Sequence, residues 1–120
     1  MTNNIKIGDE GELLTVAYLI KKGHKILETK WRFSHKEIDI ISKSDDTLVI
    51  VEVKTRKKDS IVNPAQAVTK KKQRHLIKAT QAYIDQRKLD LNVRFDIVSI
   101  IYSGNNYEIE HIEDAFIPYM

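Results

Sequence analysis

Apolar residues at helical spacing predict an amphipathic helix over residues 8–23. The stripe that this helix is expected to bury consists of Leu13, Val16, Ala17 and Ile20. Gly23 stands where a C-terminal cap is expected, because glycine readily adopts the left-handed conformation that ends many helices. Glu12 precedes Val16 by one helical turn, so its carboxylate is expected at the margin of the buried stripe.

The period then changes to that of extended chain, which predicts strands over residues 24–33, 37–42 and 47–55. The third strand is apolar on both faces, with Val49, Val51 and Val53 on one and Leu48 and Ile50 beginning the other. A strand of this kind is central in its sheet and covered on both faces.

A second, longer helix is predicted in the basic stretch that follows. Asn63, Pro64 and Gln66 suit an N-cap, a first helical position and a capping-box position, and Thr69 offers a second start. The expected buried face consists of Leu76, Ala79, Thr80 and Tyr83. A basic stripe at four-residue spacing lies on another face and consists of Lys70, Arg74 and Lys78.

Two final strands are predicted over residues 93–102 and 107–113, joined by the turn sequence SGNN. The order of helix, three strands, long helix and two strands predicts an α/β fold with a mixed central sheet. The chain of 120 residues is long enough for one core, so residues 1–120 are expected to form a single domain.

Charge is unevenly distributed along the chain. Between Lys54 and Lys88 there are 11 Lys and Arg residues against two acids, whereas the last 18 residues contain four acids and no Lys or Arg. A local basic surface favours a polyanionic partner, and DNA is the expected one. The candidate DNA-backbone contacts are Lys57, Lys58, Lys70, Lys72, Gln73, Arg74 and Lys78. A solvated helix face is the alternative for any single run of these charges.

Several classes of protein are disfavoured by the sequence. Cysteines are absent, the start lacks a secretory signal, and no apolar run is long enough to span a bilayer. The expected location is the cytoplasm, with no membrane partner. The four histidines lack metal-ligand spacing and are expected to be exposed or half-buried.

Acids inside the apolar strands are the strongest functional signal. A two-residue turn between the second and third strands pairs residues whose numbers sum to 91. Asp39 is then expected to face Glu52, and Glu37 to face Lys54, with all four side chains on one face. Two opposed carboxylates repel each other, so something must offset the repulsion.

A divalent cation would do so, because Mg²⁺ and similar hard metals prefer oxygen ligands. Metal-bound water supplies a nucleophile, and the neighbouring Lys54 can stabilise negative charge on a phosphate oxygen. The set therefore fits hydrolysis of a phosphodiester. The alternatives are an exposed Glu-x-Lys face, Asp39 as a hairpin acid, and Glu12 as a first-turn acid favoured by the helix dipole.

The arrangement resembles the PD-(D/E)XK nuclease superfamily. More closely, the segments GDEGE, EIDII, LVIVEVKTR, AVTKKKQ, RFDIVSI and IEHIEDAF resemble, in order, the YraN-like family of small bacterial proteins, which is similar to archaeal Holliday junction resolvases. The resemblance implies a restriction-endonuclease-like core. It also implies that Glu12, Asp39 and Glu52 are metal ligands, that Lys54 is the catalytic lysine and that Glu37 is a supporting acid.

The expected function is an endonuclease that requires Mg²⁺ or Mn²⁺ and cleaves DNA, particularly branched or otherwise structured DNA. A nucleic-acid-binding module without turnover and a protein-interaction domain are the alternatives. Symmetric cutting of two strands favours a two-fold homodimer. Its contact is expected from the first strand, which carries Trp31 and Phe33, or from the C-terminal strand.

Overall fold

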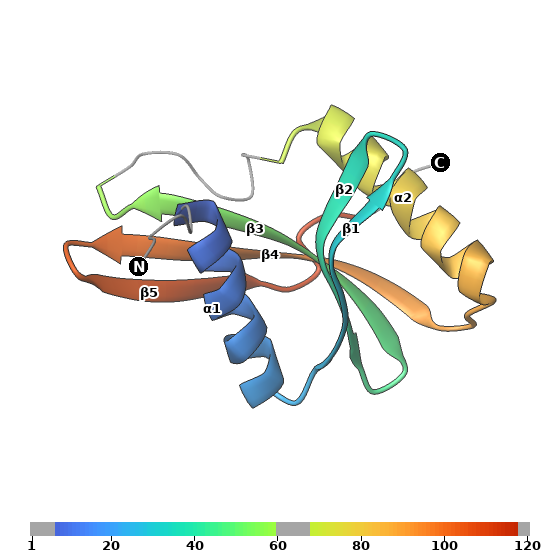
Figure 1. Ribbon diagram of the computed structural model, residues 1–120, viewed down its shortest axis with the longest axis horizontal. Coiled ribbons are helices and arrows are strands. Elements are labelled where there is room, and N and C mark those ends of the chain that lie inside the picture. Colours follow the sequence, from blue (N-terminus) through green and yellow to red (C-terminus); the bar gives the residue numbers. More distant parts are fainter. Residues whose placement is uncertain (1–6, 60–67, 118–120) are drawn as a thin grey trace, which may run out of the picture.

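Within the residues that the structure describes, two helices and five strands build a mixed α/β architecture (Figure 1). The computed structural model describes residues 7–59 and 68–117. The helices are α1 (Ile7–Lys21) and α2 (Lys70–Arg87). The strands are β1 (Lys25–Phe33), β2 (Lys36–Ser44), β3 (Thr47–Lys57), β4 (Asn92–Ser103) and β5 (Asn106–Ile112). The predicted α/β fold with a mixed central sheet is confirmed.

The strands form one sheet in the order β1-β2-β3-β4-β5. Strands β3 and β4 are parallel and the other neighbours are antiparallel, so the chain must cross over between β3 and β4, and α2 lies in that connection. The predicted register of the β2–β3 hairpin is confirmed, from Ser44 opposite Thr47 to Ile40 opposite Val51. The pairing of β2 with β3 ends there, next to Asp39.

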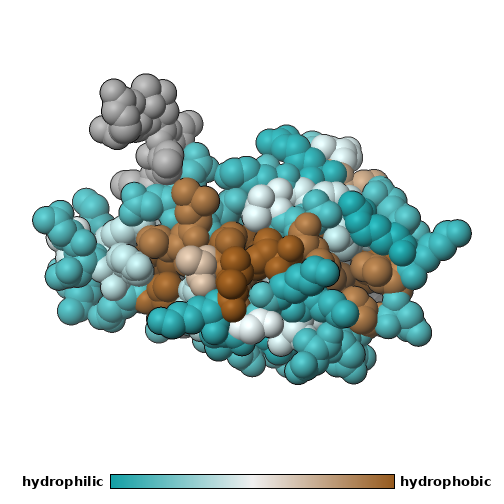
Figure 2. Space-filling view, turned by 60° about the horizontal axis from the view of Figure 1, so that its bottom comes forward, coloured by the Kyte–Doolittle hydropathy of each residue, from teal (hydrophilic) through white to brown (hydrophobic). Residues whose placement is uncertain are grey.

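Helix α1 buries a different face from the one predicted. The buried positions are Gly11, Thr15 and Leu19, whereas Leu13 is 60% exposed and Ile20 is 56% exposed. The expected stripe is therefore wrong at Leu13, Ala17 and Ile20, while Val16 is half-buried against the core. A band of apolar surface is visible on the face shown in Figure 2. Helix α1 can use its small, polar face because Gly11 has no side chain and the Thr15 hydroxyl donates to the Gly11 carbonyl at 2.7 Å.

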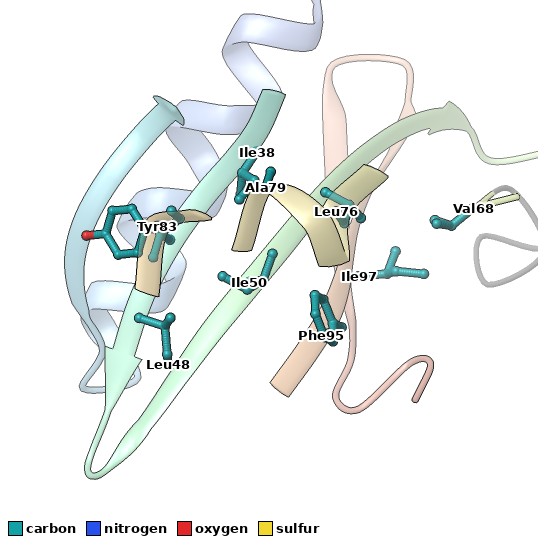
Figure 3. Packing of buried hydrophobic residues seen from close by; sticks show 10 residues of the cluster. Ile38, Leu48, Ile50, Val68, Leu76, Ala79, Tyr83, Phe95 and Ile97 are labelled. Carbon is teal, nitrogen blue, oxygen red and sulfur yellow. The ribbon is translucent and has the colours of Figure 1, made fainter. Parts of the chain in front are cut away.

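Strand β3 separates two apolar layers, as its two-faced pattern predicted. Val49 and Val51 pack with Leu19 of α1 in one layer. On the other face, Leu48 and Ile50 belong to the cluster that includes α2 (Figure 3). A helix covers each face of the sheet, so a polar residue on β3 such as Glu52 is held in buried surroundings.

Helix α2 begins at the second of its two predicted starts. Thr69 is the N-cap, and its hydroxyl accepts a 3.1 Å hydrogen bond from the backbone nitrogen of Lys72. The predicted buried face is confirmed and consists of Leu76, Ala79, Thr80 and Tyr83. The earlier start at Asn63, Pro64 and Gln66 lies outside the described residues. Neither described helix has the length and hydropathy needed to cross a membrane.

Candidate active site

Asp39 and Glu52 meet where the β2–β3 ladder ends. Asp39 Oδ2 accepts a 2.8 Å hydrogen bond from the backbone nitrogen of Val53. The side chain of Asp39 thus bonds to β3 just past the last pair of the β2–β3 ladder, Ile40 with Val51. Asp39 is also the main charged group that acts on Glu52, so the expected approach of the two carboxyl groups is confirmed.

Both carboxyl groups are unfavourably placed for carrying charge. The Glu52 side chain is only 6% exposed. Burial raises the pKa of Glu52 to about 7, and the nearby Asp39 carboxylate contributes to the rise. Burial also raises the pKa of Asp39, although the hydrogen bond from Val53 opposes this shift. Near neutral pH, the metal-free pair therefore retains part of a proton.

Two lysines approach the same oxygen of Glu52. Lys54 Nζ lies 3.6 Å from Glu52 Oε2, which confirms the predicted position of Lys54 beside this acid. Lys72 Nζ reaches the same oxygen at 3.8 Å from the first turn of α2. The sequence suggested a DNA-backbone contact for Lys72 and gave no indication of this ion pair. The pair with Lys72 depends on the tertiary fold, which brings the first turn of α2 near Glu52 in the middle of β3.

The other carboxylate oxygen of Glu52 lacks a comparable partner among the described residues. Glu52 Oε1 is buried and has no hydrogen-bond partner among residues 7–59 and 68–117. Buried oxygens are rarely left without a partner, and a bound ion is one explanation when they are. Carboxylate oxygens are the donors that Mg²⁺ and Mn²⁺ prefer, so Asp39 and Glu52 fit such a cation chemically.

Glu12 is the third predicted ligand, and α1 brings it toward the pair. Its side chain is 12% exposed, and Oε2 lies 3.4 Å from Lys30 Nζ. Burial raises the pKa of Glu12, and the charge of Asp39 raises it further. Within the described parts of the chain, however, no three metal-ligating side chains already form a group that could hold an ion. Glu12 is instead held by Lys30, so its role as a ligand stays a prediction.

Glu37 does not face Lys54 as expected. It pairs with Arg32 of β1, and Glu37 Oε1 lies 3.3 Å from Arg32 Nε. The expectation was wrong because the β2–β3 ladder ends before it reaches Glu37, which is left paired with β1 alone. The charge of Glu37 nevertheless contributes to the raised pKa of both Asp39 and Glu12.

The predicted basic surface is partly accessible. Lys70, Arg74 and Lys78 are exposed along α2, and Lys57 and Lys58 are exposed at the end of β3. An open cavity of about 740 Å³ lies at that strand end and includes both of these β3 lysines in its lining. Gln73 is engaged within the protein, since its Nε2 donates to the Val68 carbonyl at 3.1 Å. DNA contact by these residues remains untested.

The sequence reasoning missed a second buried acid, Asp96 of β4. Burial by itself would raise the pKa of Asp96, but hydrogen bonds from His111 and Arg94 outweigh it and hold the pKa at about 2. His111 Nε2 lies 2.7 Å from Asp96 Oδ2 and bonds through its other ring nitrogen to the Tyr18 hydroxyl. An acid within the apolar segment RFDIVSI was the available signal.

The Asp96 cluster differs from the Glu52 site because its charge is compensated. Asp96 Oδ1 also accepts from the backbone nitrogen of Asp114 at 3.1 Å. These bonds connect β4, the chain after β5 and α1, which indicates a structural role. The expectation of exposed or half-buried histidines was wrong for His24 and His111, since His24 is buried and the His111 side chain is only 5% exposed.

Comparisons with known proteins support the family resemblance seen in the sequence. The model of the uncharacterised protein family UPF0102 matches residues 11–100. A UPF0102 protein of Parabacteroides distasonis is 45% identical over 97% of this chain and 96% of its own length. A relative in Thermodesulfovibrio yellowstonii is 45% identical over 93% of this chain and 96% of its own length. The expected YraN-like resemblance is confirmed at this level, and neither relative's name states an activity.

Proposed function

We propose that this chain, which belongs to the uncharacterised protein family UPF0102, is a divalent-metal-dependent endonuclease that hydrolyses phosphodiester bonds of DNA. One observation carries the proposal. The half-buried Asp39 lies beside the buried Glu52, both have raised pKa values, and Lys54 lies 3.6 Å from Glu52. The resemblance of these positions to the PD-(D/E)XK superfamily supports the same assignment.

The residues present fit Mg²⁺ or Mn²⁺. Asp39 and Glu52 would hold the cation, and Glu12 is the third ligand that the superfamily resemblance implies. When bound, the cation supplies positive charge for a phosphate oxygen and lowers the pKa of a coordinated water. Glu52 retains a proton up to about pH 7, so metal binding is expected to release protons near neutrality.

The remaining polar groups have separate tasks. The backbone nitrogen of Val53 orients Asp39 through its 2.8 Å hydrogen bond. Lys54 supplies an ammonium group that stabilises negative charge as it develops on the phosphate. Lys72 shares Glu52 Oε2 with Lys54 and thereby ties the start of α2 to the site.

DNA is the substrate class that the surrounding charge favours. Exposed Lys and Arg residues on α2 and at the end of β3 would contact phosphates on either side of the cleaved bond. Such contacts carry little sequence information, so selectivity is expected to follow the shape of the DNA. Branched and flapped molecules are the proposed targets, in keeping with the likeness of the sequence to junction resolvases.

The test is a panel of linear, flapped and four-way DNA incubated with Mg²⁺ or Mn²⁺. Wild-type protein should produce discrete products that chelator abolishes. Asp39→Asn should lose both cleavage and calorimetric Mn²⁺ binding, whereas Lys54→Ala should keep Mn²⁺ binding and lose cleavage. Lys25→Ala changes an exposed lysine on β1, outside the proposed DNA contacts, and controls for loss of charge. DNA binding without cleavage or Mn²⁺ binding would instead indicate a non-catalytic nucleic-acid-binding module.

A further inference from the structure

The outward face of α1 carries apolar residues that are largely exposed among the described residues. The stripe consists of Leu13, Val16, Ala17 and Ile20. Leu13 is 60% exposed, Ile20 is 56% exposed and Ala17 is also exposed, whereas Val16 is half-buried against the core. Apolar surface continues across the middle of the face shown in Figure 2. Contiguous exposed patches of this kind mark interaction sites more often than scattered apolar residues do.

We propose that this stripe joins two copies of the chain, with their α1 helices packed antiparallel about a two-fold axis. The spacing of the stripe carries the first argument, because positions 13, 16, 17 and 20 are symmetric about the midpoint between 16 and 17. In an antiparallel pair centred there, Leu13 faces Ile20 of the second copy and Val16 faces Ala17. A self-complementary surface is what a two-fold contact requires.

Charge supplies the second argument. Helix α1 has acids in its first turn, Asp9 and Glu10, and a basic residue in its last turn, Lys21. Antiparallel packing places the acidic end of each helix near the basic end of the other, and it also opposes the two helix dipoles. Parallel packing would bring like charges together. The charge pattern therefore selects both the occupant and its direction.

The small side chain of Ala17 at the centre of the stripe favours close approach of the two α1 helices. Ala17 is small, and the distance between packed helices depends on the side chains at their crossing. The other exposed large apolar residues of the described chain are spread over several elements and include Phe33, Val93, Tyr107 and Ile117. None of these belongs to a helical stripe. We therefore place the proposed contact on α1, whereas the sequence suggested the first or the C-terminal strand.

The proposed contact borders the candidate active site. A small cavity of about 180 Å³ is lined by Glu12 and Lys30 together with Leu13 and Val16 of the stripe. A dimer formed through α1 therefore places a Glu12 from each copy beside the interface. Two sites related by one axis are the arrangement needed to cut two strands symmetrically.

Light scattering and sedimentation test the contact without metal or DNA. Wild-type protein should have twice the 13.9 kDa chain mass at micromolar concentration. Leu13→Glu and Ile20→Glu should each give a 13.9 kDa species with unchanged circular dichroism, because both positions are exposed. Ile117→Glu is the matched control, since Ile117 is 62% exposed outside the stripe, and it should remain dimeric.

A compensating pair tests the register. Leu13→Glu combined with Ile20→Lys places opposite charges across the axis twice, so it should restore the dimer that either single charge disrupts. The chain has no cysteine, so Ala17→Cys, which lies next to the axis, should form a disulfide-linked dimer on oxidation. Lys21→Cys should not form such a disulfide, because residue 21 lies away from residue 21 of the second copy in this register.

Three results would overturn the proposal. One is a wild-type protein whose measured mass stays at the 13.9 kDa of a single chain at every concentration, even if another partner is found to cover the stripe. Another is a dimer that survives Leu13→Glu. The third is a dimer that dissociates in the stripe variants but fails to cross-link through Ala17→Cys, which would exclude the antiparallel register. None of these measurements depends on nuclease activity, so failure here leaves the proposed function to its own test.

Discussion

Asp39 Oδ2 accepts a 2.8 Å hydrogen bond from the backbone nitrogen of Val53, immediately beyond the last β2–β3 pair. The position of this carboxylate is therefore set by the main chain of β3. Because the bond to Val53 needs no countercharge, Asp39 can stay beside Glu52 even though the two acids repel each other. The site holds its charges in place at a cost in stability.

Neutralising one acid should relieve that cost. We expect Asp39→Asn or Glu52→Gln to melt at the same or a higher temperature than wild type without metal, because each removes a buried, repelling charge. Neither variant should gain thermal stability from Mg²⁺ or Mn²⁺. Asn retains an oxygen that can accept from the Val53 nitrogen, so this variant tests charge and not the hydrogen bond.

Asp96, whose negative charge is offset by its hydrogen bonds, provides the contrasting control. Asp96→Asn should destabilise the protein by about 3 kcal/mol, because it removes the buried carboxylate that is bonded to Arg94, His111 and the backbone nitrogen of Asp114. If Asp39→Asn and Asp96→Asn are destabilised alike, and magnesium or manganese does not shift the wild-type melting temperature, the Asp39–Glu52 pair is structural.

Glu52 should also make stability depend on pH. The folded protein raises its pKa from 4.5 to about 7, so the native state binds this proton more tightly than the unfolded state does. The resulting stabilisation is complete below pH 4.5 and is lost as the pH rises through about 7, on the order of 3 kcal/mol. Glu52→Gln should remove this dependence.

Urea unfolding of metal-free protein between pH 4 and 8 measures the difference, with wild type falling relative to Glu52→Gln as pH rises. Parallel curves would contradict the prediction. Asp96 contributes in the opposite sense at lower pH, because its pKa is lowered from 3.8 to about 2. Its stabilisation is present above pH 3.8 and is lost as the pH falls toward 2, so the two effects occupy separate ranges.

Gly11 should be required for the position of α1. A Cβ atom at this residue would lie 2.6 Å from Cγ2 of Thr55, which is too close for van der Waals contact. Gly11→Ala should therefore destabilise the protein by about 1–3 kcal/mol, although alanine is the better helix former. Urea denaturation of Gly11→Ala with Thr55→Ser should show recovery, because serine lacks the methyl group. A stabilised Gly11→Ala protein would show that α1 does not need this close approach.

Reversing charge on the outer face of α2 should weaken DNA binding. Arg74→Glu and Lys78→Glu are expected to reduce affinity for every DNA tested and to lower the salt slope by about one unit for each lost phosphate contact. Lys25→Glu changes an exposed lysine on β1 and serves as the control. Fluorescence anisotropy across a salt series measures both quantities. Unchanged affinity in both α2 variants would make this face a solvated one.

Local patterns were sufficient wherever the answer depended on neighbouring residues. The register of the β2–β3 hairpin followed from a two-residue turn, and Ile40 lies opposite Val51 as predicted. The buried face of α2 followed from helical periodicity and includes Leu76 and Tyr83. In both elements, short-range geometry leaves one arrangement that buries the apolar side chains.

Helix α1 shows where periodicity fails. Its apolar stripe was visible in the sequence, but the face that meets the sheet is chosen by the close approach of Gly11 to Thr55, 44 positions later in the chain. Glu37 shows the same limit, because its partner depends on where the β2–β3 ladder ends. Periodicity measures amphipathicity, and it does not state which neighbour covers a face.

The acids and lysine of the candidate site were identified by sequence alone, since charged residues inside apolar strands are unusual whatever the fold. Tertiary structure decided how those groups are placed and charged. The tertiary fold brings Lys72 of α2 to Glu52 of β3, and burial raises the pKa of that acid and leaves Oε1 without a described partner. These properties arise because segments distant in the sequence exclude solvent from the site. They do so only once the chain has folded.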